Sequence, residues 1–187
     1  MAEAASPPAL ARVFGADEIA TRVGEMAARI DAVYGEEPMV AICVLNGAFM
    51  FFSDLVRRIA NPRLELDFVR LSSYGMNSVS SKHIVMIKDI ELDVRGKHVI
   101  IVEDIVDSGH TMRFLLDQLG CRKPKSLAVA ALVDKRERRE ADVDVAFSGF
   151  CLPEGFIVGY GMDYAGRYRN LPDIRELVNP AAHDAQL

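Results

Sequence analysis

The sequence predicts an α/β domain with a mainly parallel central sheet and helices on both faces. Three apolar runs, at residues 39–45, 99–102 and 127–133, are too short for helices and rich in β-branched residues, which is typical of strands buried on both faces of a parallel sheet. Other segments show helical patterns, and strands that alternate with helices favour a parallel sheet. The length of 187 residues suits a single domain with a substantial core.

Composition and charge exclude several classes of protein. The chain is 50% hydrophobic and 26% charged, as in ordinary globular proteins. A net charge of -5 and a pI near 5.4 argue against a general binder of nucleic acids or anionic membranes. Residues 1–10 show no signal peptide, and no apolar run approaches the length of a membrane span. The cysteines, Cys43, Cys121 and Cys151, lack zinc-site spacing, so we expect a cytoplasmic protein.

The beginning of the chain is expected to fray and then to form a helix. Residues 1–12 are rich in alanine and proline, which favours a frayed end. A helical pattern begins at Asp17 and is broken at Pro38. Its apolar face carries Ile19, Val23, Met26, Ile30 and Val33.

A strand, a glycine-containing turn and a second helix follow. Strand 39–45 ends at Asn46 and Gly47 and leads to a helix over residues 48–59, whose inward residues are Phe51, Leu55 and Ile59. This unit gives the sheet a second edge that can bind a ligand. On its own, the turn also fits an ordinary strand-to-helix connection made by Asn and Gly.

Two further strands flank a long polar insertion. Apolar and acidic side chains alternate at residues 64–68, which predicts a half-exposed strand, and a similar strand is expected at residues 83–87. The connection at residues 71–82 is small, polar and too long for a tight hairpin. By composition alone it fits a linker without fixed structure. A last alternating strand is expected at residues 143–150.

The central strand ends in an acidic string on which the rest of the prediction depends. Residues 99–102 are followed by Glu103 and Asp104, then by Asp107 and the small polar turn at residues 108–111. A helix follows at once, because apolar residues recur at helical spacing: Met112, Leu115, Leu116 and Leu119.

Each part of this string has a chemical use. Parallel sheets bind ligands at the carboxyl ends of their strands, where Glu103 and Asp104 are expected to lie. The turn offers backbone N–H groups at a helix N-terminus, beside the hydroxyl groups of Ser108 and Thr111, and these favour a phosphate. The acids then face sugar hydroxyls or Mg²⁺. The alternative is a strand end that meets water through its acids, followed by an ordinary helix cap.

The string resembles a known signature. Glu-Asp-Ile-Val-Asp-Ser-Gly, at residues 103–109, is similar to the 5-phosphoribosyl-1-pyrophosphate (PRPP) signature of type I phosphoribosyltransferases, above all their hypoxanthine-guanine branch. Three other segments resemble that branch, and the similarity spans roughly residues 37–173. These segments are Val133-Asp134-Lys135, the run from Phe156 to Tyr164, and Arg169 within residues 167–172.

The resemblance implies both a fold and an activity. The fold is a single type I phosphoribosyltransferase domain over residues 1–187, with an inserted β-ribbon or lid and a small hood from the N-terminal helix and the C-terminal segment. The activity is Mg²⁺-dependent purine salvage, which transfers 5-phosphoribosyl from PRPP to N9 of hypoxanthine or guanine and gives IMP or GMP plus pyrophosphate. The resemblance also implies a homodimer or homotetramer, with no nucleic-acid or membrane partner.

The resemblance further assigns roles to individual residues. PRPP and its 5′-phosphate would be held by Glu103, Asp104, Asp107, Ser108, Gly109, His110 and Thr111. Pyrophosphate would be bound by Asn46, Gly47, Ser73, Tyr74 and Arg169. The purine would contact Ile105, Lys135, Phe156, Ile157 and Asp163. Mg²⁺ would be bound by Glu103, Asp104 and Asp163.

Two of these residues would be catalytic, and one departs from the pattern of the family. Asp107 would take or share the N7 proton of the purine, and Lys135 would stabilise charge on the purine oxygen. Asn46 stands where the family usually has lysine, which keeps the backbone N–H donors of that loop but removes a positive charge.

Two alternatives remain open at this point. One is a phosphoribosyltransferase for uracil, xanthine or adenine, against which Lys135 and Asp163 favour a 6-oxopurine. The other is a non-catalytic PRPP or nucleotide sensor, such as the RNA-binding regulators built on this fold. The acidic net charge and the presence of every expected catalytic residue type argue against a sensor.

Overall fold

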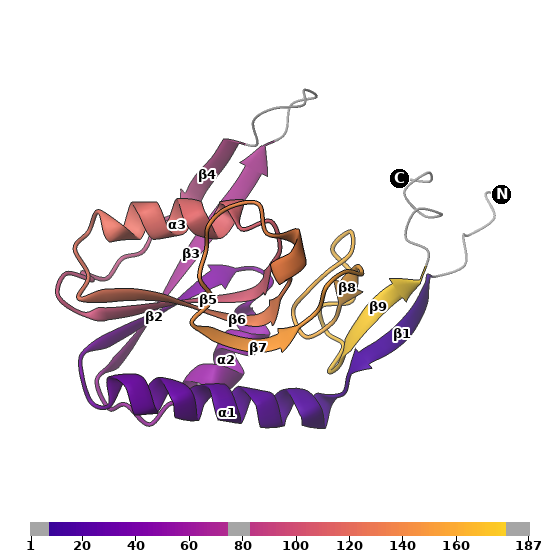
Figure 1. The fold of residues 1–187 in the computed structure, drawn as a ribbon, viewed down its shortest axis with the longest axis horizontal. Helices are drawn as coiled ribbons and strands as arrows, with labels where there is room; N and C mark the ends of the chain where they lie inside the picture. Colours follow the sequence, from indigo (N-terminus) through magenta and orange to yellow (C-terminus); the bar gives the residue numbers. More distant parts are fainter. Residues whose placement is uncertain (1–7, 75–82, 179–187) are drawn as a thin grey trace.

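The computed structural model describes residues 8–74 and 83–178, and it shows a large sheet beside a small one (Figure 1). The large sheet has six strands in the order β4-β3-β2-β5-β6-β7, all parallel except β4. The elements in chain order are β1 (Ala9–Phe14), α1 (Ala16–Tyr34), β2 (Met39–Leu45), α2 (Phe49–Val56), β3 (Leu64–Tyr74), β4 (His83–Lys88), β5 (His98–Val106), α3 (His110–Gly120), β6 (Ser126–Asp134), a 3₁₀ turn (Arg136–Arg138), β7 (Phe147–Cys151), β8 (Ile157–Val158) and β9 (Ile174–Val178).

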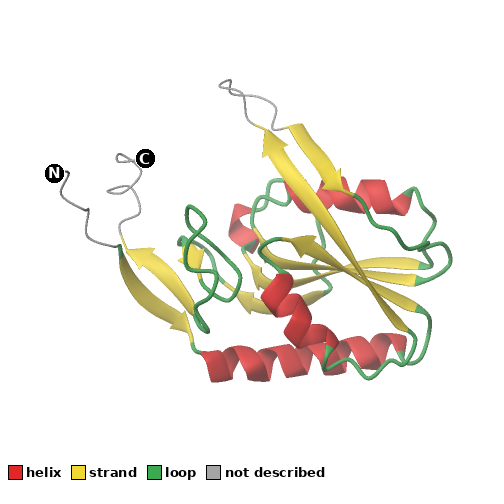
Figure 2. Cartoon of the chain, turned by 180° about the vertical axis from the view of Figure 1, so that it is seen from behind, coloured by secondary structure: helices red, strands yellow, loops and turns green. Residues whose placement is uncertain are grey.

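Helices cover both faces of the large sheet, which confirms the predicted architecture. Helices α1 and α2 pack on one face and α3 on the other (Figure 2). The apolar face of α1 buries Ile19, Val23, Met26 and Ile30, as its spacing predicts, whereas Val33 stays exposed. No helix in the described part of the chain is long and apolar enough to cross a membrane.

Strand β5 is longer than its apolar run. The ladder with β6 continues past Val102 and pairs Glu103 with Ala131 and Val106 with Asp134. Glu103 and Asp104 therefore lie inside β5 rather than beyond its end, because the pairing of β5 with β6 continues past both residues. Their carboxylates project from the last part of this strand. The carboxyl edge of the sheet thus begins one or two residues after the acid pair.

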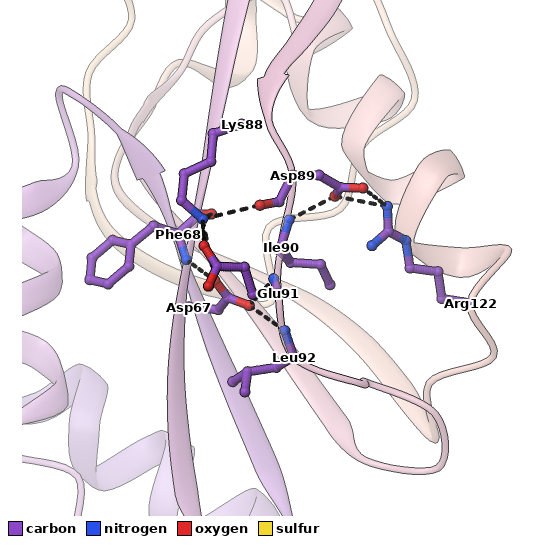
Figure 3. Close-up of polar contacts among 8 residues, drawn as sticks. All are labelled: Asp67, Phe68, Lys88, Asp89, Ile90, Glu91, Leu92 and Arg122. Carbon is purple, nitrogen blue, oxygen red and sulfur yellow. Dashed lines mark hydrogen bonds and ion pairs between the residues drawn. The ribbon is translucent and has the colours of Figure 1, made fainter.

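The β3–β4 ribbon buries an acid that the alternating pattern would place in water. Leu66 and Phe68 are 44% and 38% exposed, whereas Asp67 is 5% exposed. Its carboxylate accepts hydrogen bonds from the backbone N–H groups of Glu91 and Leu92 at 2.7 and 2.8 Å (Figure 3). These charge-assisted bonds compensate for burial of the acid, and they attach the segment after β4 to β3.

The small sheet joins the two ends of the described chain in the order β1-β9-β8, with antiparallel pairs. The prediction that residues 1–12 fray is wrong for residues 9–12, because Ala9 pairs with Val178 and Arg12 with Arg175. Helix α1 packs on the large sheet, so the N-terminal contribution to the small sheet is β1.

Strand β7 begins later than the alternating pattern predicts. It spans Phe147–Cys151, and its parallel ladder with β6 starts where Ala130 pairs with Phe147. The preceding residues are held elsewhere, since the carbonyl of Val143 accepts a hydrogen bond from Arg139 at 2.8 Å. The sheet register therefore starts only after this segment.

Candidate functional site

A turn between β5 and α3 forms one wall of the site. Gly109 precedes α3 with a φ of 87°, a left-handed conformation that glycine adopts without strain. Within the described residues, the backbone N–H groups of Ser108, Gly109, His110 and Thr111 donate to no other group of the chain. We call residues 107–111 the phosphate turn, because free N–H groups at a helix N-terminus favour an anion.

The acid pair lies at the base of the same pocket. A cavity of about 210 Å³ is lined by residues 103–109 together with Thr111 and Met112. Glu103 and Asp104 are only 9% and 8% exposed. Burial raises the pKa of both carboxyl groups above their ordinary values, and for Glu103 the neighbouring charge of Asp104 adds to the effect. Two buried acids at one place favour a cationic ligand or a set of hydroxyl donors.

The loop after β2 packs directly on this acid pair. A Cβ atom added to Gly47 would lie 1.9 Å from Oδ2 of Asp104, and one added to Gly161 would lie 2.1 Å from the carbonyl oxygen of Gly47. The peptide bond between Leu45 and Asn46 is cis, and Asn46 is exposed. Three chain segments thus meet at Gly47 without room for another side chain.

The third of these segments carries Asp163 and Arg169. Arg169 donates to the carbonyl oxygen of Gly161 at 2.7 Å and pairs with Asp163 at 2.6 Å. The positive charge of Arg169 also favours the ionised form of Asp104. Arg169 therefore brings a positive charge to the loop after β2, where Asn46 provides none.

Lys135 lies beside the phosphate turn, and its backbone N–H donates to the carbonyl oxygen of Val106 at 3.0 Å. It is 4% exposed, and its Nζ donates to the carbonyl oxygen of Gly155 at 2.6 Å. Burial lowers its pKa, and the nearby charge of Asp107 opposes that shift. Asp107 itself pairs with the exposed Arg138 at 3.0 Å. A buried ammonium group thus faces the same space as the carboxylate of Asp107.

An aromatic side chain stands beside this lysine. Phe156 follows Gly155 directly, is 44% exposed, and meets the ring of Tyr164 edge to face at 5.5 Å. Ile157 begins β8 and pairs with Glu176 of β9, with its side chain 5% exposed. An exposed ring next to a buried ammonium group suits a flat polar base.

The remaining predicted residues lie at or beyond the limits of the described chain. Ser73 and Tyr74 end β3, with backbone pairing to Ile84 and His83. The segment interpreted as a lid falls largely at residues 75–82, which lie outside the described residues. Ile105 is partly buried and packs on the core cluster beside α1 and α2.

The carboxylates of the site fit a metal ion whose remaining ligands come from a bound substrate and water. Among the described residues, no three His, Cys, Asp or Glu side chains form a group that could hold a metal ion. Mg²⁺ commonly takes one or two carboxylates together with water and substrate oxygens, and Glu103 and Asp104 offer such a pair. Asp163 is already engaged by Arg169 and by the N–H of Gly166 at 2.8 Å, so a metal there would share its carboxylate.

Sequence reasoning missed two residues that hold the site together. Tyr160 donates from its hydroxyl to Asp54 on α2 at 2.6 Å, and so joins the segment before Asp163 to the helix after Gly47. Arg139 is half-buried against the phosphate turn, although the charged run around it has the pattern of a solvated loop. Neither contact leaves a local signal, because the partners lie far apart in the sequence.

Comparisons with known proteins agree with this geometry. A model of the phosphoribosyl transferase domain family matches residues 14–165. Hypoxanthine phosphoribosyltransferase from Salmonella typhimurium is 46% identical over 163 residues, which cover 86% of this chain and 91% of the relative. Hypoxanthine-guanine phosphoribosyltransferase from Bacillus subtilis is 43% identical and covers 90% and 93%. A crystal structure of a Bacillus anthracis hypoxanthine-guanine phosphoribosyltransferase superposes with a TM-score of 0.83 at 41% identity, covering 90% and 97%.

Proposed function

The chain belongs to the phosphoribosyltransferase family, and we propose that it transfers the 5-phosphoribosyl group of PRPP to hypoxanthine or guanine. The sequence-based predictions of family, fold and enzyme class are confirmed by the family model and by relatives of this type. The protein is accordingly a purine-salvage transferase whose products are IMP or GMP and pyrophosphate.

One observation carries the choice of substrates. The phosphate turn lines one cavity together with the buried acids Glu103 and Asp104, and the buried ammonium group of Lys135 lies close enough to Asp107 of this turn for their charges to interact. A sugar phosphate spans the first part of this space, and a base with a carbonyl oxygen meets Lys135. An adenine amino group would present a donor to a donor there and would be disfavoured.

In the proposed reaction, N9 of the purine attacks C1′ of PRPP as the bond from C1′ to the pyrophosphate oxygen breaks. The electron pair leaves with pyrophosphate, and the N7 proton of the purine passes to the carboxylate of Asp107. The phosphate turn fixes the 5′-phosphate, and Arg169 with the N–H groups around Gly47 holds the departing pyrophosphate. Phe156 stacks on the base, and the backbone of Ile157 reads its edge.

The proposed cofactor is Mg²⁺, held by Glu103 and Asp104 on the ribose side and by Asp163 on the pyrophosphate side. When bound, it would neutralise the charge that grows on pyrophosphate. The raised pKa of the two buried acids supports this role, because a divalent cation favours their ionised forms.

The test is nucleotide formation from PRPP with hypoxanthine, guanine, xanthine, adenine and uracil in parallel, with and without Mg²⁺. We expect turnover with hypoxanthine and guanine, and loss of turnover when the metal is chelated. Turnover with adenine or uracil alone would contradict the assignment of the base. Binding of PRPP without turnover of any base would favour the sensor.

Replacing Lys135 with methionine separates recognition of the base from recognition of the sugar. Loss of one charged hydrogen bond is expected to raise the KM for hypoxanthine about 10- to 100-fold, with a smaller effect on PRPP. Because burial lowers the pKa of Lys135, its proton is lost at a lower pH than that of a solvated lysine. The wild-type kcat/KM for hypoxanthine should therefore fall on the alkaline side, and the variant should lack that fall. Equal effects on both substrates would argue against a base-reading lysine.

We also propose a homodimer or homotetramer in the cytoplasm. The support is a patch of exposed apolar side chains on neighbouring elements, between 38% and 53% exposed, comprising Phe49, Leu66, Phe68, Val85 and Ile87. Phe68 meets Phe52 of α2 with ring centroids 5.5 Å apart, so the patch extends from the ribbon onto that helix. Such patches commonly mark contacts between protein chains. Light scattering that gives the mass of a monomer would contradict this proposal.

A further inference from the structure

The phosphate turn is held from behind by one neighbouring segment, residues 134–143, which we call the clamp segment. The carbonyl oxygen of Ser108 accepts hydrogen bonds from the backbone N–H groups of Glu140 and Ala141, at 2.9 and 3.0 Å. The clamp segment begins at Asp134, the last residue of β6, and Lys135 lies within it. One segment therefore contacts the phosphate turn and also carries the residue proposed to read the base.

Arg139 extends this contact to the two preceding carbonyl groups. Its Nε donates to the carbonyl oxygen of Asp107 at 3.2 Å, and its Nη2 donates to that of Val106 at 3.4 Å. Its Nη1 donates to the carbonyl oxygen of Val143 at 2.8 Å. The side chain is only 14% exposed. The flat guanidinium group thus joins both ends of the clamp segment to the backbone of the phosphate turn.

The charge of Arg139 is balanced inside the protein. Its guanidinium group pairs with the carboxylate of Asp134, whose side chain is 1% exposed. Arg136 contacts the same carboxylate at 2.8 Å but is 68% exposed and reaches no carbonyl of the turn. The two arginines therefore share one acid and differ in their contact with the phosphate turn.

Gly109 is packed on the stem of the same arginine. A Cβ atom added to Gly109 would lie 2.7 Å from Cδ of Arg139. In a trans peptide unit the carbonyl of one residue and the N–H of the next point in opposite directions. Carbonyl groups of Asp107 and Ser108 that are anchored to the clamp segment therefore fix the N–H groups of Ser108 and Gly109 on the pocket side.

We infer that Arg139 is a positioning residue that aims the backbone N–H groups of the phosphate turn at the 5′-phosphate. This inference rests on the proposed function. Arg139 does not line the pocket, so its loss weakens the binding of every ligand that carries the 5′-phosphate, namely PRPP and IMP. Recognition of the purine by Lys135 and Phe156 is affected much less.

Three variants test this role. Arg139→Met removes all the contacts, whereas Arg139→Lys keeps the ion pair with Asp134 but replaces the fork by a single ammonium group. The matched control is Arg136→Met, which removes the other partner of Asp134 and no contact with the turn. For each variant we would measure thermal stability, KM for PRPP and hypoxanthine, kcat, and the dissociation constants of PRPP and IMP.

We expect Arg139→Lys to keep a melting temperature near that of the wild type and to raise the KM for PRPP and the dissociation constants of PRPP and IMP by about 10-fold. Arg139→Met should raise them further, to about 100-fold, and the KM for hypoxanthine should change by less than about threefold. Arg136→Met should match the wild type. Equal increases in KM for PRPP and for hypoxanthine would overturn the inference. So would KM values and dissociation constants of Arg139→Lys that match those of Arg136→Met. Absence of turnover in the wild type would instead reject the proposed function.

Discussion

Replacing Asp107 with asparagine is expected to lower kcat by about 10²- to 10⁴-fold, the range over which a positioned proton acceptor contributes. The amide keeps the size of the carboxylate but takes no proton. The backbone of residue 107 stays anchored, because its carbonyl contact to Arg139 does not involve the side chain. Binding of PRPP should therefore be largely kept, which isothermal calorimetry can measure beside steady-state kinetics.

Asp117→Asn is the matched control for this substitution, because Asp117 is an exposed acid on α3 that pairs with Arg113 outside the site. It should leave kcat unchanged. The deficit of Asp107→Asn should also shrink at alkaline pH, since a purine that has already lost its proton needs no acceptor. Unchanged turnover in Asp107→Asn would remove the general-base role, and a parallel loss of PRPP affinity would assign Asp107 to binding.

The parts of the fold that the sequence predicted are those with a local physical cause. The strands around residues 39–45, 99–102 and 127–133 and the helix after the acidic string follow from short apolar runs and a helical period, which need no distant partner. The pairing of β1 with β9 depends on segments more than 150 residues apart in sequence. Nothing within residues 9–14 specifies that partner, so the sequence predicts a frayed end for residues 1–12, which include most of this strand.

Asp67 shows how a distant partner overrides a local pattern. Its place in an alternating strand predicts exposure, but two backbone N–H groups from residues 91 and 92 make its burial favourable. The same reasoning explains Arg139, which lies in a charged run typical of a solvated loop and is half-buried because it donates to carbonyl groups about 30 residues away. The sequence shows the charge and size of each of these side chains, but it does not show the distant backbone groups that they contact.

The candidate site was predicted to a larger extent than these examples suggest, because its residues are concentrated in contiguous strings. Residues 103–111 form one wall through a strand end and a helix start, both of which have local signatures. The meeting of this wall with Gly47 and Gly161 was not predictable, since a glycine that admits a close backbone approach looks like any turn glycine. The structure brings the predicted segments together, and the roles of the individual residues stay predictions.

Gly47→Ala should therefore be among the most damaging small substitutions in the chain. The new methyl group would start 1.9 Å from Oδ2 of Asp104, and Gly161 blocks retreat on the other side of Gly47. Asp104 is buried and accepts a hydrogen bond from the N–H of Ile105 at 2.9 Å, so its short side chain has little room to turn. Either the loop or the carboxylate must move, and displacement of about 1 Å costs on the order of 10² in rate.

We accordingly expect kcat/KM for PRPP to fall about 100-fold in Gly47→Ala, measured by initial rates at saturating hypoxanthine. Gly24→Ala on α1 is the matched control, because a Cβ atom there meets nothing within 4 Å. That change should leave the kinetics alone and raise the free energy of unfolding by about 0.5–1 kcal/mol, the usual difference between alanine and glycine inside a helix. If both alanine variants had wild-type kinetics, the contact between Gly47 and Asp104 would not hold the acid pair in place. The pyrophosphate and ribose sides of the site would then be mechanically independent, which the packing at Gly47 argues against.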